Sequence, residues 1–392
     1  MAVLSAGLAP SAAAADAQPQ QWYLKAMKAD EMWGVSTGEG VKVAVIDSGV
    51  KPDTSSLKGQ VLADEVPAAV AYGATKDYTG HGTTMAELIA GTGSGNGLKG
   101  IAPGAKIVPF RIVANSLKNK ADLKKTASAA EAIRAAADSD VKILSMSFGS
   151  PGEDPEEAAA IKYAQSKGKL MFASVGNNAE TKNLIGYPAA YPYVVGVAAS
   201  DESGTAGKFS EYGNYVDLAA PGLDIPAWCD ATFRAYCDRA GTSMSAAIAS
   251  ASAALIWSAH PKWTANQVLA SLIDTAGRDW AKDDPSTYLG YGLIRPRMVL
   301  EQSDFDPGSA DTDPLAKENA TGVTGEASAS PAASASAPSQ PPNGAAADRT
   351  SATGSSSDAS DNTAMWVALG VAVAGLSIGA GVFKMVRARR AA

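Results

Sequence analysis

The chain has 392 residues, of which 46% are hydrophobic and 19% are charged, so it is long enough and apolar enough for one large folded domain with further segments. Its formal net charge is −7, and no basic stripe occurs outside the last few residues. Because binding to the phosphates of a nucleic acid needs a basic surface, this charge argues against nucleic acid as the main partner.

The first residues resemble part of an export signal. Residues 2–15 are apolar and rich in alanine, and Ala13-Ala14-Ala15 is typical of a signal peptidase site. A complete signal peptide also needs a positively charged start, and none precedes this short run. We therefore expect residues 1–21 to be either the remnant of a signal peptide or a disordered alanine-rich tail.

Residues 22–302 have the pattern of one large domain in which strands and helices alternate. Strands that are apolar on both faces and separated by helices are typical of a parallel sheet covered on both sides. We therefore predict a three-layer α/β fold with a mostly parallel central sheet and functional residues at the carboxyl ends of its strands. The strands are expected at 41–46, 106–113, 141–147, 169–175 and 193–199, and the helices at 81–90, 127–137, 155–167 and 243–259.

Three polar residues lie at the ends of these elements. Asp47 follows a strand in VAVIDSGV, His81 begins a helix in GHGTTMAELIA, and Ser243 begins a helix in GTSMSAAIASASAALI. A serine hydroxyl is a poor nucleophile at neutral pH, so a base such as imidazole must take its proton as it attacks. A carboxylate can orient that imidazole and stabilise its charged form. We predict that the three meet in one cleft; each alone is equally compatible with a turn or helix-cap residue.

Only two cysteines occur, Cys229 and Cys237, and they lie close together in the sequence. No further Cys or His is near enough in the sequence to complete a metal site with them. We predict a local disulfide, which stabilises a loop by about 2–3 kcal/mol. Two free thiols in a cytosolic protein are the alternative.

The last ninety residues predict a stalk and a membrane anchor. Residues 303–363 are rich in Ser, Ala, Pro, Asp and Thr, so they cannot bury enough apolar surface to offset their conformational entropy, and we expect a disordered stalk. The uncharged run at 364–383 would form a helix about 30 Å long, which matches the core of a bilayer. We predict one transmembrane helix over 364–386 and a basic cytoplasmic tail at 387–392, which places the catalytic domain outside the bacterial cell membrane. A buried core helix is the alternative, but it should show a polar face.

The segments around Asp47, His81 and Ser243 resemble the three signatures of subtilisin-like serine peptidases, in that family's chain order. The resemblance runs from about Gly38 to Arg295. It implies the subtilisin-like three-layer fold and hydrolysis of peptide bonds through an acyl-enzyme on Ser243. It also implies that Asn177, in a Gly-Asn element, completes the oxyanion hole.

The same resemblance indicates which segments of the chain bind the substrate. Ser147, Phe148 and Gly149 match the family's edge segment, with which an extended peptide pairs as an added strand. Two further segments match the walls of the primary specificity pocket, with a cis bond before Pro188: Ser174, Val175 and Gly176 in one, and Gly186, Tyr187, Pro188 and Ala189 in the other. We expect no cofactor or catalytic metal. Structural calcium is common in the family, but no acidic loop here is dense enough to place an ion.

The opening QQWYLKAMKADEMW, the catalytic domain, the stalk and the anchor together are similar to the mycosins, membrane-anchored subtilisins associated with type VII secretion. This similarity implies a protein or peptide substrate outside the cytoplasm and a type VII secretion complex as a partner. The chain departs from mycosins in having a single cysteine pair. Two alternatives stay open: a structural subunit of a membrane complex whose protease activity is incidental, and a degradative surface protease with no dedicated partner.

Overall fold

A six-stranded parallel sheet runs through the computed structural model, which describes residues 17–113 and 117–325. The strand order is β2-β1-β3-β5-β7-β8. Side chains along each strand alternate between two apolar clusters, one on each face, so both faces are covered. The strands are β1 (Lys42–Asp47), β2 (Lys106–Arg111), β3 (Ile143–Met146), β5 (Leu170–Ser174), β7 (Val195–Ser200) and β8 (Leu218–Pro221).

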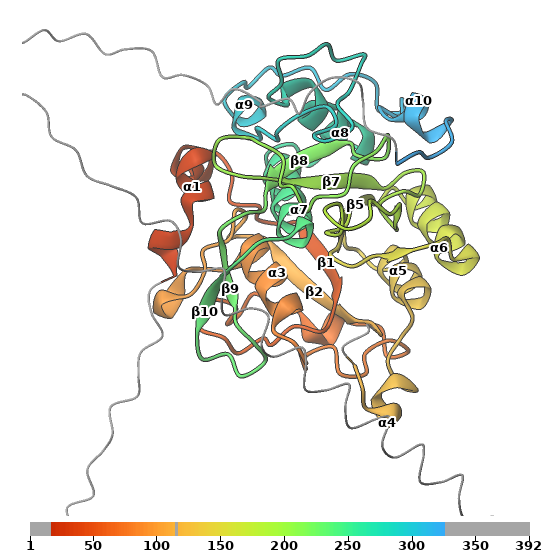
Figure 1. Ribbon diagram of the computed structural model, residues 1–392. Helices are drawn as coiled ribbons and strands as arrows, with labels where there is room; N and C mark the ends of the chain where they lie inside the picture. The colour runs from red at the N-terminus through yellow and green to blue at the C-terminus, as the bar shows by residue number, and fades with distance from the viewer. Residues whose placement is uncertain (1–16, 114–116, 326–392) are drawn as a thin grey trace, which may run out of the picture. The chain divides into compact units, whose positions relative to one another are not determined.

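Helices form a layer on each side of this sheet. On one face, α3 (His81–Ala90), α7 (Thr242–Ala259) and α8 (Ala265–Thr275) pack against strand residues such as Val45 and Phe172. On the other face lie α5 (Ala129–Asp138) and α6 (Pro155–Ser166), which Figure 1 shows together at the right, away from α3 and α7. The predicted three-layer α/β arrangement is confirmed.

Helix α7 is apolar on all sides because the domain surrounds it. Among the described residues it is the helix that is long and apolar enough to cross a membrane, but 89% of it is buried inside the domain. It is therefore a core helix, which needs no polar face. The predicted membrane helix at 364–386 and the tail at 387–392 lie outside the described residues.

Short elements complete the described residues. The antiparallel pairs are β4 (Ser150–Pro151) with β6 (Gly186–Tyr187), and β9 (Ile225–Trp228) with β10 (Tyr236–Arg239). The short helices are α1 (Trp22–Ala26), α2 (Ala29–Trp33), α4 (Lys120–Leu123), α9 (Arg297–Leu300) and α10 (Ala316–Asn319). Single 3₁₀ turns occur at Gln18–Gln20, Ala63–Glu65 and Ser94–Asn96.

The direction of the chain across the sheet reverses at β1. From β1 the chain crosses by α3 to β2 on one side, and it then returns by α5 to β3 on the other side. Because these two crossovers cover opposite faces, a crevice opens beyond the carboxyl ends of β1 and β3. In parallel α/β sheets this is the usual place for a functional site.

The folded part extends beyond both boundaries predicted from the sequence. Ala17 is 1% exposed, although residues 1–21 were expected to be a remnant or disordered. At the other end, Leu315 is 2% exposed and the Asn214 side chain donates to the carbonyl of Gly322 at 2.8 Å, so the expected stalk does not begin at 303. A buried leucine and backbone hydrogen bonds hold this polar segment in place. The rest of the expected stalk, from residue 326, lies outside the described residues.

Candidate active site

The three predicted catalytic residues lie at one edge of the sheet. Asp47 is the last residue of β1, His81 is the first of α3, and Ser243 is the second of α7. Alternation along β1 turns Asp47 toward the face covered by α3 and α7, the same face as Val43 and Val45. One strand end and two helix starts therefore bring the three side chains to the same crevice.

The carboxylate of Asp47 holds the imidazole of His81. Nδ1 of His81 lies 2.8 Å from Oδ1 and 2.9 Å from Oδ2 of Asp47. A carboxylate can only accept, so Nδ1 donates and Nε2 is left as the base. Burial lowers the pKa of His81, but the charges of Asp47 and Asp77 together with the hydrogen bond that His81 donates to Asp47 raise it by more, so this pKa lies above its ordinary value of 6.5.

A second carboxylate, Asp77, fixes the loop that leads into His81. Its Oδ1 accepts from the N–H of Thr79 at 2.9 Å and from the hydroxyl of Ser48 at 2.8 Å, and its Oδ2 accepts from the N–H of Thr83 at 2.8 Å. The sequence analysis missed this residue. The Asp-x-Thr-Gly run just before a predicted helix is typical of turn and capping residues, and this signal could have indicated it.

The hydroxyl of Ser243 lies in a cleft of about 300 Å³ that His81 and Asn177 also line. It donates to the carbonyl oxygen of Ser147 at 3.3 Å, and the hydroxyl of Ser147 donates to the carbonyl of Ser243 at 3.0 Å. This hydroxyl therefore has to rotate before it can contact the imidazole of His81. Such catalytic hydrogen bonds often form only when substrate is bound.

Two hydrogen-bond donors lie beside this hydroxyl. Oδ1 of Asn177 accepts from the N–H of Thr242 at 2.9 Å and from the hydroxyl of Thr242 at 3.1 Å. A backbone N–H can only donate, so the amide oxygen of Asn177 faces Thr242 and Nδ2 faces away from it. Ser243 is in the first turn of α7, where backbone N–H groups have no partner within the helix. These two donors are suited to a developing negative charge.

The residues predicted to bind substrate lie on neighbouring segments next to the cleft. The extended segment after β3 leads into β4, and β4 pairs with β6, so the edge segment and the second pocket wall adjoin. The hydroxyl of Ser174 is 3.5 Å from the carbonyl oxygen of Phe148, which joins the first wall to the edge segment. The Tyr187–Pro188 bond is cis, as predicted. The residues brought together in this way are Ser147, Phe148, Gly149, Ser174, Val175, Gly176, Tyr187 and Pro188.

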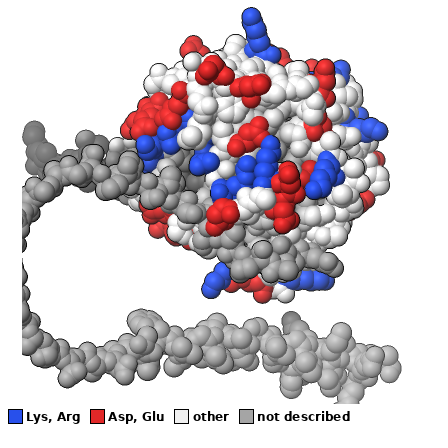
Figure 2. Space-filling model, turned by 90° about the horizontal axis from the view of Figure 1, so that it is seen from above, with Lys and Arg blue, Asp and Glu red and all other residues white. Residues whose placement is uncertain are grey.

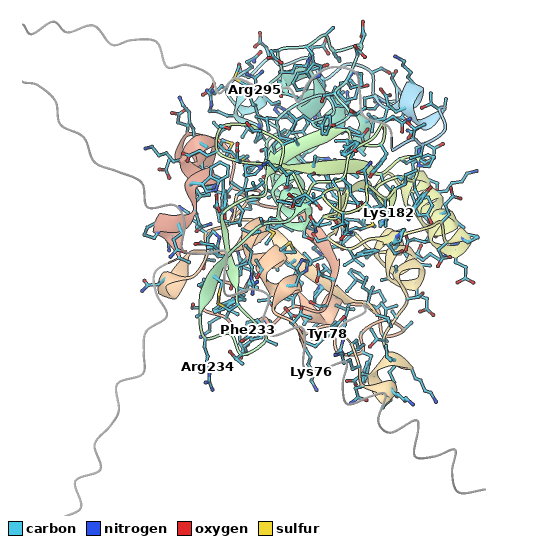
Figure 3. All side chains as sticks on the ribbon, viewed as in Figure 1. Lys76, Tyr78, Lys182, Phe233, Arg234 and Arg295 are labelled. Carbon is cyan, nitrogen blue, oxygen red and sulfur yellow. A yellow bond between two sulfur atoms is a disulfide. The ribbon has the colours of Figure 1, made fainter. Side chains whose placement is uncertain are left out.

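The hairpin of β9 and β10 lines the cleft with His81. Cys229 and Cys237 form a disulfide across the hairpin, as predicted, and Trp228, Cys229 and Arg239 line the cleft. Figure 3 shows Phe233 and Arg234 of the hairpin at the lower edge of the molecule.

A buried carboxylate ties this hairpin to the helix of His81. Glu87 of α3 accepts from the hydroxyl of Tyr236 at 2.8 Å and from the hydroxyl of Thr54 at 2.7 Å. Burial raises the pKa of Glu87 to about 7.

Charged groups elsewhere in the described residues bear on whether this chain can hold a metal cluster or presents a basic patch. Within residues 17–113 and 117–325, no three His, Cys, Asp or Glu side chains are placed to share a metal ion. Figure 2 shows basic and acidic side chains interspersed on the face that it presents. That the reaction needs no metal, and that nucleic acid is not a partner, stay predictions.

Comparisons with known proteins agree with this geometry. The subtilase family matches residues 38–292. Thermitase from Thermoactinomyces vulgaris is 30% identical over 285 residues, which are 69% of this chain and 95% of thermitase. The structure of MycP3 protease from the type VII (ESX-3) secretion system is 27% identical, with a TM-score of 0.59 over 75% of this chain and 90% of that one. A MycP1 serine protease, described as an essential component of the type VII (ESX-1) secretion system, has a TM-score of 0.61 at 25% identity, over 75% of this chain and 91% of its own.

Proposed function

This chain belongs to the subtilase family and is a serine endopeptidase, and we propose that it cleaves peptide bonds with Asp47, His81 and Ser243. The observation that carries the proposal is the 2.8 Å contact between Nδ1 of His81 and Asp47 beside a cleft that also contains Ser243. In this arrangement the base is oriented and the nucleophile lines the same cleft.

The reaction follows from the position of each donor and acceptor. Nε2 of His81 takes the proton of Ser243 as Oγ bonds to the carbonyl carbon of the substrate, and Asp47 stabilises the charged imidazole without being protonated itself. Nδ2 of Asn177 and the N–H of Ser243 donate to the oxyanion. His81 then gives the proton to the leaving amine, which breaks the peptide bond and leaves an acyl group on Ser243. Water attacks this ester in the same manner and frees the enzyme.

Removing the nucleophile tests the proposal against a matched serine of the same helix. Ser243→Ala should lower the turnover of casein by about 10⁶-fold, because it removes the hydroxyl on which the acyl-enzyme forms. Ser252→Ala removes another buried hydroxyl of α7, which donates to the carbonyl of Ile248 at 2.9 Å away from the cleft, and should leave turnover unchanged. Casein cleavage by Ser243→Ala at the rate of the Ser252→Ala control would contradict the proposal.

We further propose that the enzyme acts outside the cytoplasm while a helix at 364–386 holds it at the membrane. The uncharged run, followed by Lys384, Arg387 and further arginines, supports this orientation. The full chain should then sediment with membranes, whereas a chain ending at residue 363 should stay soluble. Added protease should digest the catalytic domain of intact spheroplasts; protection of that domain would contradict the orientation.

A second candidate function is a structural role in a secretion complex. It is favoured by the similarity to a MycP1 protease that is described as an essential component of the type VII (ESX-1) secretion system. A cell that carries only Ser243→Ala separates the two functions. Secretion that persists with Ser243→Ala but fails without residues 364–392 would favour the structural role, and secretion that fails with Ser243→Ala would favour proteolysis.

A further inference from the structure

A buried carboxylate lies between the two walls predicted for the primary specificity pocket. Glu211, in the loop between β7 and β8, is 2% exposed. A Cβ atom on Gly176 would lie 1.9 Å from Oε2 of Glu211, and a Cβ atom on Gly186 would lie 3.3 Å from the same oxygen. Gly176 belongs to one wall and Gly186 begins the other. The carboxylate can approach both walls only because neither residue has a side chain.

The position of this carboxylate is fixed by the first wall. The N–H of Glu211 donates to the carbonyl of Gly176 at 3.0 Å, and Oε1 accepts from Nδ2 of Asn178 at 3.3 Å. Burial raises the pKa of Glu211, while hydrogen bonds from Asn178 and Leu184 lower it by less, so this pKa stays above its ordinary value.

Within the described part of the chain, no basic side chain neutralises this group. Among the described residues, no Lys, Arg or His forms an ion pair with Glu211. Lys182, in the loop between the two walls, is labelled in Figure 3 and is exposed. A buried carboxylate without a counter-ion is unfavourable, so a cation that entered here would be bound strongly.

The surroundings of the second wall are also acidic. The hydroxyl of Tyr187 donates to Oε1 of Glu153 at 2.9 Å. The chain continues from Glu153 into the amino end of α6 with three further acids, Asp154, Glu156 and Glu157. Like charges near the mouth of a pocket draw cations toward it and repel anions.

We propose that Glu211 is a specificity-determining residue, which makes the enzyme prefer substrates with Arg or Lys immediately before the cleaved bond. A basic side chain between the walls supplies the missing counter-charge where water is excluded and charge pairs are strong. An apolar side chain there leaves the carboxylate uncompensated. The inference rests on the proposed function, because it takes Ser243 as the nucleophile and these walls as the site for the residue before the cleaved bond.

A peptide series that differs only at that residue tests the inference. The wild type should cleave Arg and Lys peptides with a kcat/KM about tenfold or more above that of the Leu peptide. Glu211→Gln keeps the size of the side chain and removes its charge, so it should lose most of this preference while cleavage of the Leu peptide changes little. Glu202→Gln removes the same charge from an exposed side chain in the turn at 201–205 and should leave the preference unchanged.

A second measurement needs no variant and therefore does not depend on the folding of Glu211→Gln. Citrulline has the shape of Arg without its charge, so the wild type should cleave the Arg peptide about tenfold faster than the citrulline peptide. Equal rates on these two peptides, or an Arg-to-Leu ratio that Glu211→Gln leaves unchanged, would overturn the inference. Failure of the proposed function is a different result, in which the wild type cleaves no peptide of the series and Ser243→Ala behaves in the same way.

Discussion

At the scale of single residues, His81 is influenced by two carboxylates with different tasks. Asp47 bonds to the ring, whereas Asp77 holds the backbone before and after His81 and acts on the ring through its charge. Because the imidazole must be neutral to act as the base, activity should rise with pH as His81 loses its proton. The raised pKa of His81 places that rise above pH 6.5.

Replacing Asp77 should therefore move the pH profile. Asp77→Asn removes a charge that raises the pKa of His81, so the acid limb of kcat/KM should shift to lower pH. The profile of kcat/KM against pH measures this shift, and Asp64→Asn, which removes an exposed charge, should leave the limb in place. An acid limb that stays at the same pH or shifts to higher pH in Asp77→Asn would show that Asp77 holds the loop in place but does not raise the pKa of His81.

The residues of the site differ in how far the sequence predicts them. Asp47, His81 and Ser243 each lie in a short motif at the end of a strongly patterned element, so local sequence is enough to single them out. Glu211 could not be predicted in this way, because it approaches Gly176 and Gly186 only after the chain has folded. Ser147 was predicted from its motif as part of the edge segment, but its contact with Ser243, in which the carbonyl of Ser147 accepts from the hydroxyl of Ser243, appears only in the folded chain.

At the scale of elements, α3 and the β9–β10 hairpin are joined through Glu87. The folded state raises the pKa of this carboxyl from 4.5 to about 7, so the folded protein binds more protons than the unfolded chain between these values. Stability from this group is therefore present at acid pH and is lost as pH rises from 4.5 through 7. The contact between α3 and the β9–β10 hairpin, beside the cleft, should therefore weaken toward alkaline pH.

Glu87→Gln should remove this pH dependence. The shift in the pKa of Glu87 corresponds to about 3 kcal/mol of unfolding free energy. The wild type should lose this amount of stability between pH 4.5 and pH 8, whereas the stability of Glu87→Gln should not fall in this way. Urea unfolding at a series of pH values measures the difference between the two proteins. Glu180→Gln, the same replacement at an exposed position, should show the same pH dependence of unfolding free energy as the wild type. Parallel curves for wild type and Glu87→Gln would show that Glu87 is already charged in the folded state.

The elements themselves were predicted unequally. Long periodic helices and apolar strands such as α3 and β1 were found within a few residues of their bounds, because burial on both sides of a sheet leaves a clear pattern. Strand β8 was missed because four residues of sequence LAAP have neither β-branched side chains nor alternation. Helix α8 was also missed, although a capping box of Thr264 and Gln267 marks its start.

At the scale of the whole molecule, the segment 303–325 belongs to the folded domain. Its composition is that of a disordered stalk, and its few large apolar side chains, Phe305, Leu315 and Val323, are too widely spaced to give a periodic signal. What holds it is contact with distant parts of the chain: the side chain of Asn183 donates to Gly325, and the N–H of Tyr193 donates to Asn319. Such contacts are invisible in the sequence of the segment alone.

A domain that ends at residue 302 should therefore be less stable than one that ends at residue 325. Leu315 is 2% exposed, and loss of its burial alone should cost about 2–3 kcal/mol of unfolding free energy. Urea unfolding of the two truncated chains measures the difference. In the chain ending at 325, Leu315→Ala should reproduce much of the loss, while the exposed Lys317→Ala should not. Equal urea midpoints for the two truncated chains would show that residues 303–325 add no stability, as expected of a stalk that begins at residue 303.

The central claim is that one hydroxyl, activated by one imidazole, performs the chemistry. Labelling with a fluorophosphonate tests it directly, because the reagent bonds to a serine only where a base and an oxyanion hole activate it. Mass spectrometry should find the label on Ser243 in the wild type, and His81→Ala should lose it while remaining folded by circular dichroism. A label on another serine, or a label on Ser243 that persists in His81→Ala, would contradict the account.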